Sequence, residues 1–491
     1  MEAEESATLR KAFRELPDVA AQESLQPPGS GALYVPASHT NALSLDTTVV
    51  VGMRGAGKSV WTAALLDVDT RQRLVRAGAP SSLEQTHVQV GYSVDPAEGK
   101  HPSKDVLQNL IAAGFEPRHI WSAVLARKLA ENSELPLPPS KRWSETVAWV
   151  KQDPEAFEQL LAQCAQTLKS QGKNFLLVFD SMDTTVPGKW RDVRSLARGA
   201  LEVALMCRPY SNIRLKFFMR PDMEEDPEIT DFRDASKLMH NKVELMWRPV
   251  DLYGLVFHVL ANGAAGRQFR TLVSQSTGLE WSQSDSAYQL PASLRSTSDA
   301  QWQVIDTLAG PYMGTNKRRG YTYTWIPLHL ADAFGRVAPR SLLLALRTAA
   351  EITEEEYPVG QPLHYEGIKR GVAQASEVRV AELSKEDYPW VTPLLRALRG
   401  LTVPLDLTDV KRRWTKTVRD SAIGACSDKL PPRRYSSVNA PRQTTDLLID
   451  DLVELGVVYR TGDNRLNIPD IFRVGFEIRR KGGVRPPVPS T

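Results

Sequence analysis

The sequence predicts an α/β fold with a parallel sheet core, a helical lid and a small C-terminal domain. From Thr47 to about Asn262, short apolar runs alternate with long stretches of helical periodicity, as in βαβ units. From Leu328 to about Gly400 the periodicity is helical throughout. Near the C-terminus, a helical pattern is followed by two short strand patterns around a polar turn. These three patterns together favour a multidomain α/β protein.

Length and composition agree with this fold class. A chain of 491 residues is long enough for about two to four domains. No run of about 18 apolar residues occurs, and the acidic, amphipathic N-terminus has no apolar core of a signal peptide, so we expect no membrane partner. The three cysteines, Cys164, Cys207 and Cys426, lack CxxC spacing, which predicts a reducing compartment, the cytoplasm, and excludes a thiolate zinc cluster.

The elements of the core follow in order along the chain. The predicted strands are 47–53, 86–94, 174–180, 213–219 and 242–247. The helical stretches between them include 105–130, 142–171 and 192–207, with a loop at 132–141. The predicted domains are a segment leading into the core (1–45), the α/β core (46–262), an insertion or lid region (263–327), a helical lid subdomain (328–400) and a winged-helix-like domain (401–491).

A glycine-rich turn follows the first predicted strand. The segment VVVGMRGAGKS matches GxxxxGK[ST] from Gly52 to Ser59. Glycines let backbone N–H groups surround phosphates, Lys58 reaches the β- and γ-phosphate oxygens, and the Ser59 hydroxyl ligates Mg²⁺. The following helix points its positive end at the anion. The sequence therefore predicts a P-loop NTPase that binds ATP and Mg²⁺ through Gly52, Arg54, Gly55, Ala56, Gly57, Lys58, Ser59 and Val60. For Arg54, contact with the γ-phosphate and pairing with a nearby acid both remain open.

A second acidic site follows the third predicted strand. The run NFLLVFDSMD has the apolar composition of a central buried strand and ends in Asp180. A carboxylate at this strand end can hold the Mg²⁺ water shell, so Asp180 joins Ser59 as a predicted metal ligand. Asp183 is the candidate that orients or deprotonates the attacking water, with ordinary loop chemistry as its alternative.

These motifs resemble those of the STAND and AAA+ branches of P-loop ATPases. The pattern hhhhDxxD around Asp180 carries the resemblance, and so does the strand IRLKFFM before Arg220, which in STAND proteins ends in a γ-phosphate sensor. The resemblance implies that Arg220 takes this role, with a surface arginine as the alternative. The segment KVELMWRPVDLYGLVFHVL resembles the strand, linker and helix that follow.

The segment GRVAPRSLLLAL resembles the helical lid of these ATPases, and Pro339-Arg340 that of the KAP branch. The spacing departs from the simple Gly-x-Pro motif, but the resemblance implies a nucleotide contact for Arg340. Further segments, among them HLADAFGRVAPRS and IPDIFRVGFEIRRKGGV, are similar to those of bacterial P-loop ATPases found in defence-type gene clusters.

The C-terminal part is mildly basic. From Leu401 onward, 16 Lys and Arg face 11 Asp and Glu, whereas the whole chain has a net charge of +3. A helix ending at Gly456, a strand, the turn TGDN and a second strand predict a winged helix, for which DNA binding and protein packing both remain open. The candidate phosphate contacts are Lys411, Arg412, Lys416, Arg419, Arg460, Arg465 and the run RRKGG at 479–483, with Trp414 as an anchor.

A basic turn, Lys317-Arg318-Arg319, lies among aromatic residues and has three interpretations: an arginine finger, a nucleic-acid contact or a solvated loop. For the whole chain we predict an ATP-driven switch that acts on a protein partner or through self-assembly, and the resemblance implies a role in bacterial anti-phage defence. The alternatives are a DNA-binding AAA+ loader or regulator, and a nucleotide-binding scaffold with little turnover. A small kinase is disfavoured by the length of the chain.

Overall fold

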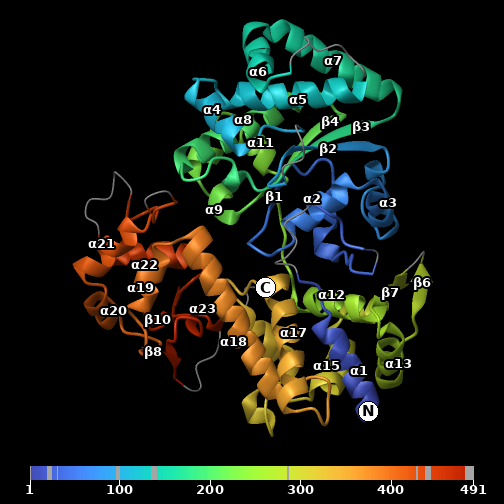
Figure 1. The fold of residues 1–491 in the computed structure, drawn as a ribbon, viewed down its shortest axis with the longest axis vertical. Helices are drawn as coiled ribbons and strands as arrows, with labels where there is room; N and C mark the ends of the chain where they lie inside the picture. The colour runs from blue at the N-terminus through green and yellow to red at the C-terminus, as the bar shows by residue number, and fades with distance from the viewer. Residues whose placement is uncertain are drawn as a thin grey trace. The chain divides into compact units, whose positions relative to one another are not determined.

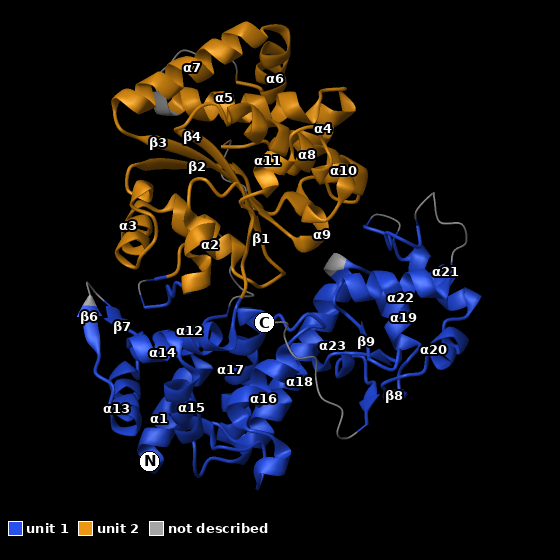
Figure 2. Cartoon of the chain, turned by 180° about the vertical axis from the view of Figure 1, so that it is seen from behind, with its two compact units in different colours: residues 1–20, 29–36, 247–491 blue, residues 21–28, 37–246 orange. Residues whose placement is uncertain are grey.

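The computed structural model describes residues 2–18, 25–29, 31–95, 100–133, 141–284, 287–426, 429–436 and 444–481. The chain forms two compact units (Figure 2). Unit 2 comprises residues 21–28 and 37–246, and unit 1 comprises residues 1–20, 29–36 and 247–491. Most of the predicted loop at 132–141 and part of the run at 479–483 lie outside the described residues.

Unit 2 is built on a five-stranded parallel sheet, which confirms the predicted fold class. Its order is β2-β3-β4-β1-β5, so β4 lies between β1 and β3. All five predicted strands are present, but the first and last are shorter than predicted. Their bounds are β1 Val49–Val51, β2 Thr86–Tyr92, β3 Asn174–Phe179, β4 Ile213–Met219 and β5 Val243–Glu244.

Helices cover both faces of this sheet. Successive residues of a strand point to opposite faces, and in the central strand β3 the residues on both faces are apolar. Phe175, Leu177 and Phe179 pack in one core with the long helices, while Leu176 and Val178 are buried on the opposite face. Figure 1 shows α5 and α8 on one side of the sheet and α2 and α3 on the other. The helices are α2 Lys58–Leu66, α3 Val68–Arg76, α4 Lys104–Ala112, α5 Pro117–Ser133, α6 Trp143–Gln152, α7 Pro154–Ser170 and α8 Trp190–Cys207.

Shorter elements complete unit 2. Three of them are 3₁₀ helices and three are single-turn α-helices that follow β4 along the chain. Their bounds are η1 Ala37–Leu43, η2 Ser81–Leu83, η3 Met182–Thr184, α9 Pro221–Glu224, α10 Pro227–Thr230 and α11 Ser236–Met239.

A buried lysine connects the sheet to the segment that precedes β1. Lys216 of β4 is fully buried, and its Nζ donates hydrogen bonds to the carbonyl oxygens of Ala42, Ser44 and Thr47 at 2.8, 2.8 and 2.6 Å. The ammonium group thus satisfies three carbonyls at the end of η1 and in the turn after it. This arrangement fixes the approach of the chain to β1.

Unit 1 is mainly helical and is centred on a pair of long helices, α17 Pro339–Glu356 and α18 Tyr365–Glu382. A Cβ at Gly371 would collide with the carbonyl oxygen of Ala345, so glycine permits the close approach of α18 to α17. The N-terminal helix α1, Ala3–Arg14, also belongs to this unit. Its buried Arg10 donates hydrogen bonds to Glu354 and to the carbonyl oxygen of Pro358 at 3.0 and 3.1 Å.

The segment predicted as an insertion or lid region, 263–327, consists of short helices and a hairpin. Its apolar residues Phe269, Val304 and Leu308 belong to the same hydrophobic core as the long helices of unit 1. Its elements and their neighbours are α12 Pro249–Asn262, α13 Gly266–Thr277, β6 Ser282–Ser284, β7 Ala287–Gln289, α14 Ala292–Ser296, α15 Ser298–Ala309, η4 Lys317–Arg319 and α16 Thr322–Leu330.

The C-terminal part contains the helix and hairpin that the sequence predicts. Helix α22 ends at Glu454, Gly456 adopts the left-handed conformation (φ 71°), and the antiparallel strands β9 and β10 enclose the turn TGDN. Its elements are η5 Leu383–Asp387, α19 Val391–Arg396, β8 Thr402–Val403, α20 Leu407–Arg413, α21 Lys416–Gly424, α22 Thr445–Glu454, β9 Tyr459–Arg460, β10 Leu466–Asn467, α23 Asp470–Arg473 and β11 Arg479–Arg480. No helix within the described ranges is long and apolar enough to cross a bilayer.

Candidate functional site

The glycine-rich loop connects β1 to α2 at the carboxyl end of the sheet. The backbone N–H of Gly52 bonds to the carbonyl oxygen of Met219 at 3.0 Å, which continues the pairing of β1 with β4. Gly55 and Gly57 have φ values of 76° and 99°, a conformation that other residues rarely adopt. Gly57 is also the N-cap of α2, so the loop passes directly into a helix N-terminus. This geometry suits an anion held by backbone N–H groups.

Lys58 folds back over the loop. Its Nζ donates hydrogen bonds to the carbonyl oxygens of Gly52 and Met53 at 2.7 and 3.1 Å. Burial of the ammonium group lowers the pKa of Lys58 to about 8, and the nearby carboxylates of Asp180 and Asp183 partly oppose this shift. Among the described residues, the hydrogen-bond acceptors of this ammonium group are carbonyl oxygens, and an incoming phosphate would offer it a negatively charged acceptor.

Asp180 directly follows β3 and is 2% exposed. Burial raises the pKa of Asp180, whereas a hydrogen bond from the Ser59 hydroxyl and the charge of Lys58 favour the ionised carboxylate. Its Oδ1 is buried and has no hydrogen-bond partner among the described residues. The structure thus places the two predicted metal ligands, Ser59 and Asp180, in contact. A hydroxyl and a carboxylate oxygen lacking a partner form a donor set that fits Mg²⁺.

Asp183 and Arg220 lie at the ends of neighbouring strands. Asp183 is in η3, after β3, and its Oδ2 lies 3.3 Å from Nη1 of Arg220, which directly follows β4. The turn before η3 places Ser181 in the left-handed conformation (φ 57°), and the Thr184 hydroxyl donates to its carbonyl oxygen at 2.8 Å. Because β4 lies between β1 and β3, Arg220 follows the strand between those that position Lys58 and Asp180.

Asp222 is a residue that the sequence analysis missed. Its two carboxylate oxygens accept hydrogen bonds from Nε and Nη2 of Arg220 at 3.0 and 3.3 Å, and its side chain is 11% exposed. The short helix α9 begins at Pro221, and its first turn brings Asp222 back towards Arg220. The motif Arg-Pro-Asp after an apolar strand carried this signal, since proline favours the start of a helix there.

The remaining predicted site residues are Arg54, Ala56 and Val60, in and after the loop, and Arg340 in unit 1. Arg54 and Val60 are half-buried in and after the loop, and Ala56 is buried. Arg340 belongs to unit 1, in the first turn of α17, where it forms an ion pair with Glu382 of α18 at 2.5 Å. Its predicted contact with nucleotide remains a prediction.

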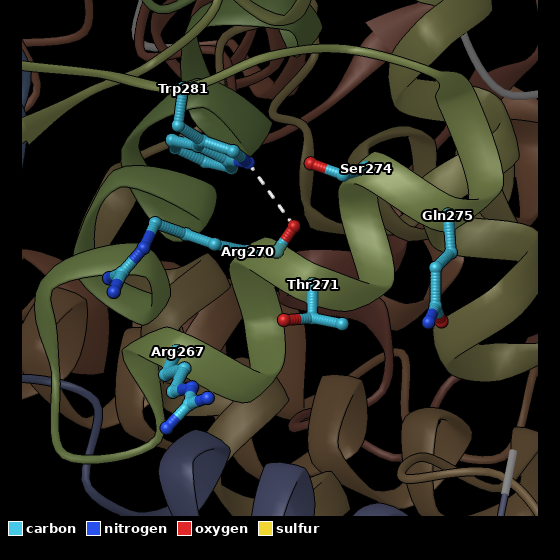
Figure 3. Close-up of a pocket in the computed structure, with 6 residues that line it drawn as sticks. All are labelled: Arg267, Arg270, Thr271, Ser274, Gln275 and Trp281. Carbon is cyan, nitrogen blue, oxygen red and sulfur yellow. Dashed lines mark hydrogen bonds between the residues drawn. The ribbon is translucent and has the colours of Figure 1, made fainter.

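An open depression on α13 in unit 1 is lined by Arg267, Arg270, Thr271, Ser274, Gln275 and Trp281 (Figure 3). The guanidinium of Arg270 lies 3.5 Å from the ring centre of Tyr288, and Nε1 of Trp281 donates to the carbonyl oxygen of Arg270 at 3.2 Å. Arg270 and Trp281, two of the lining residues, thus make contacts that stabilise the local structure. Among the described residues that line the depression there is no carboxylate and no other group for general acid or base chemistry.

No known family matches the sequence, and no curated protein matches it. Among solved structures, the chain is similar to the ORC2 protein of Aeropyrum pernix in its ADPNP-ADP complexes, with a TM-score of 0.42, 12% identity, and coverage of 95% of this chain and 96% of that one. It is also similar to a Walker-type ATPase of Pyrococcus abyssi (TM-score 0.34, 12% identity, coverage 92% and 98%). A third is CDC6P of Pyrobaculum aerophilum (TM-score 0.32, 11% identity, coverage 92% and 95%).

Proposed function

We propose that the chain binds ATP with Mg²⁺ and hydrolyses it at the carboxyl end of the sheet of unit 2. The observation that supports this most is the contact of Ser59 with Asp180 beside Lys58, at the loop between β1 and α2. The proposal does not depend on the solved structures named above, because their similarity to this chain is low.

The loop would bind the phosphates with its backbone N–H groups, and Lys58 would exchange its two carbonyl partners for phosphate oxygens. Ser59 and the unpartnered oxygen of Asp180 would hold Mg²⁺. When bound, Mg²⁺ neutralises charge on the phosphates. Burial raises the pKa of Asp180, so a cation at this carboxylate would relieve an unfavourable charge in the folded protein.

Asp183 and Arg220 would act on the γ-phosphate and the attacking water. Arg220 pairs with Asp183 in this structure, and a γ-phosphate would compete with the carboxylate for the guanidinium. Once released, Asp183 would orient the water. In this way a bound γ-phosphate would release the carboxylate of Asp183 from Arg220, and the carboxylate could then orient the water.

Two further nucleotide contacts belong to the proposal. Arg54 in the loop would reach the γ-phosphate, or else pair with an acid nearby. Arg340 would contact the nucleotide after giving up its ion pair with Glu382. We also retain the predicted division into five domains, including a winged helix at 401–491, as part of this proposal.

The nucleotide cycle would act as a switch that controls self-assembly or a protein partner. The resemblance of several segments to defence-associated bacterial ATPases suggests a role in anti-phage defence, and the buried free thiols of the three cysteines are consistent with the cytoplasm. The alternatives remain a DNA-binding loader or regulator and a nucleotide-binding scaffold with little turnover.

The site assignment is tested by binding of a fluorescent ATP analogue and by phosphate release. Lys58→Ala should abolish binding or turnover, because it removes the cation that faces the phosphates. Asp183→Asn should keep binding and slow turnover by about 100-fold or more, the contribution of a positioned base. Lys169→Ala, at an exposed lysine of α7, is the matched control. Wild-type turnover by Lys58→Ala would disprove the site.

The same proteins test the switch by light scattering with ATP, with ADP and without nucleotide. A change in particle mass with ATP that Lys58→Ala lacks would support nucleotide-controlled assembly. Turnover without any change in mass or partner binding would contradict the switch but leave the ATPase site intact. Binding without turnover, unaffected by Asp183→Asn, would favour the scaffold.

A further inference from the structure

Residues 311–321 of unit 1, here called the basic loop, form a small hairpin. Tyr312 and Tyr321 pair as an antiparallel bridge, and the N–H of Met313 bonds to the carbonyl oxygen of Gly320 at 2.9 Å. At the tip, the N–H of Arg318 bonds to the side chain of Asn316 at 3.1 Å and caps the 3₁₀ helix η4. The loop therefore has a defined backbone in the unliganded protein.

Packing beneath the tip restricts the loop further. The aliphatic stem of Arg319 lies against Gly314, where a Cβ would approach its Cγ to 2.8 Å. A Cβ at Gly320 would lie 3.1 Å from the indole of Trp325 in α16, which itself stacks on His329 at 3.8 Å between ring centres. A partner that binds this loop would meet a preorganised surface and would lose little entropy in ordering it.

The tip presents three consecutive cations. Lys317, Arg318 and Arg319 are exposed, and within the described part of the chain none of them forms an ion pair with a carboxylate. By contrast, the basic residues that the sequence offers as candidate phosphate contacts in the C-terminal part are largely neutralised by neighbouring acids. Those ion pairs are Lys411–Asp446, Arg412–Asp409, Lys416–Asp420, Arg460–Asp450 and Arg465–Asp463.

An exposed aromatic ring lies next to these cations. Tyr321 is 42% exposed, whereas Trp302 and Tyr312 beside it are half-buried. Its ring is supported by Trp302 and Tyr312, with ring centres at 5.3 and 5.4 Å. A supported and partly exposed ring beside several cations is the combination that binds single strands, in which a base stacks on the ring and phosphates meet the cations.

We propose that the basic loop binds single-stranded nucleic acid, with phosphates at Lys317, Arg318 and Arg319 and an unstacked base on Tyr321. This inference goes beyond the proposed ATPase, because the loop belongs to unit 1, whereas the residues around Lys58 belong to unit 2. Of the two places where the sequence left a nucleic-acid contact open, the C-terminal part and the basic turn, this inference selects the basic turn.

The test uses the full chain and a short fluorescein-labelled oligothymidylate, with anisotropy measured at several salt concentrations. The triple variant Lys317→Ala/Arg318→Ala/Arg319→Ala should weaken binding at least tenfold and reduce the salt slope by about 2, since each neutralised phosphate contributes roughly 0.7 on single strands. Tyr321→Ala should weaken binding at least about fivefold and Tyr321→Phe should not, because stacking needs the ring alone. The matched control is Lys411→Ala/Arg412→Ala/Lys416→Ala, which removes three cations that are paired.

Each other outcome overturns the proposal. An undetectable affinity of the wild type, an unchanged triple variant, or an equal loss in the control would exclude the basic loop as the nucleic-acid site. Equal binding of a duplex, together with an unaffected Tyr321→Ala, would exclude base stacking. Unchanged oligonucleotide binding with reduced phosphate release in the triple variant would identify an arginine finger instead. The ATPase proposal is tested separately, by nucleotide binding and phosphate release in Lys58→Ala. The same variant should bind the oligonucleotide like the wild type, so that failure of one proposal can be told from failure of the other.

Discussion

At the scale of single residues, the protonation of Lys58 predicts how the affinity for a nucleotide depends on pH. Burial lowers its pKa to about 8, whereas a bound phosphate would favour the charged form and raise the pKa. Above pH 8 the unliganded protein loses this proton, so nucleotide binding must take it up again. The affinity for the nucleotide should therefore fall as the pH rises above about 7. At lower pH Lys58 is already charged, so its ionisation should have little effect on the affinity.

We expect the Kd of an ATP analogue to rise by about tenfold between pH 7 and pH 9, the ratio of charged fractions for a pKa near 8. Calorimetry in two buffers of different ionisation enthalpy should show an uptake of nearly one proton at pH 9. Lys58→Arg is the control, since arginine keeps its charge over this range. The same pH dependence in Lys58→Arg would assign the effect to another group.

Asp222 is predicted to position Arg220 without touching the nucleotide. Its carboxylate holds two nitrogens of the guanidinium, a geometry that fixes the orientation of arginine. Asp222→Asn should lower kcat by about tenfold, or ~1.4 kcal/mol, because Arg220 would shift towards Asp183. The Kd of the ATP analogue should change by less than about threefold, and Asp222→Glu should restore part of kcat.

The discrimination of ATP from ADP separates this role from a merely structural one. If Arg220 senses the γ-phosphate, its disorientation should reduce the ratio of ADP to ATP dissociation constants. Loss of binding to both nucleotides in equal measure, together with a lower thermal midpoint, would contradict a positioning role.

At the scale of elements, Lys216 of β4 holds the segment before β1 against the sheet through three hydrogen bonds. Lys216→Met would leave the carbonyl oxygens of Ala42, Ser44 and Thr47 without their buried donor. Since each unsatisfied buried group costs about 1–3 kcal/mol, we expect a loss of about 3 kcal/mol or more. For a unit of this size, the loss should lower the thermal midpoint by roughly 6–12 °C.

Differential scanning fluorimetry measures this shift, with Lys169→Met at an exposed position of α7 as the control. A decrease no larger than that of the control would show that water replaces the ammonium group. A buried lysine with three carbonyl partners was not foreseeable from the sequence. The run IRLKFFM shows two charged residues, Arg214 and Lys216, inside an apolar strand, and it does not show what they contact.

Sequence patterns predicted the strands of the core well, since a buried parallel strand requires a continuous apolar run. The run at 174–180 became β3, and the run at 213–219 became β4 with the same bounds. The prediction was less accurate for the edge strand β5, because 242–247 contains a strand of only two residues. Edge pairing depends on a neighbouring strand, which a local pattern does not contain.

At the scale of the whole molecule, the distribution of charge changed the interpretation most. Counting residues made the C-terminal part the basic region, with 16 basic and 11 acidic residues. In the folded chain, many of those cations face acids one helical turn away or on a neighbouring element, such as Lys411 and Asp446. The net charge of a segment therefore does not say which cations remain available to a partner.

The sequence by itself determined the glycine-rich loop and the apolar strand that ends at Asp180, because the spacing of glycine, lysine and serine and the apolar run are local. It also determined the α/β class, since helical and strand periodicities are local too. Only the tertiary structure decided that β4 lies between β1 and β3, which brings Arg220 to Asp183. It alone showed Asp222 on Arg220, and it alone showed that the cations of the basic loop form no ion pair with a carboxylate in the described part of the chain. Contacts between strands and ion pairs depend on distances between residues far apart in the chain, and no local pattern encodes them.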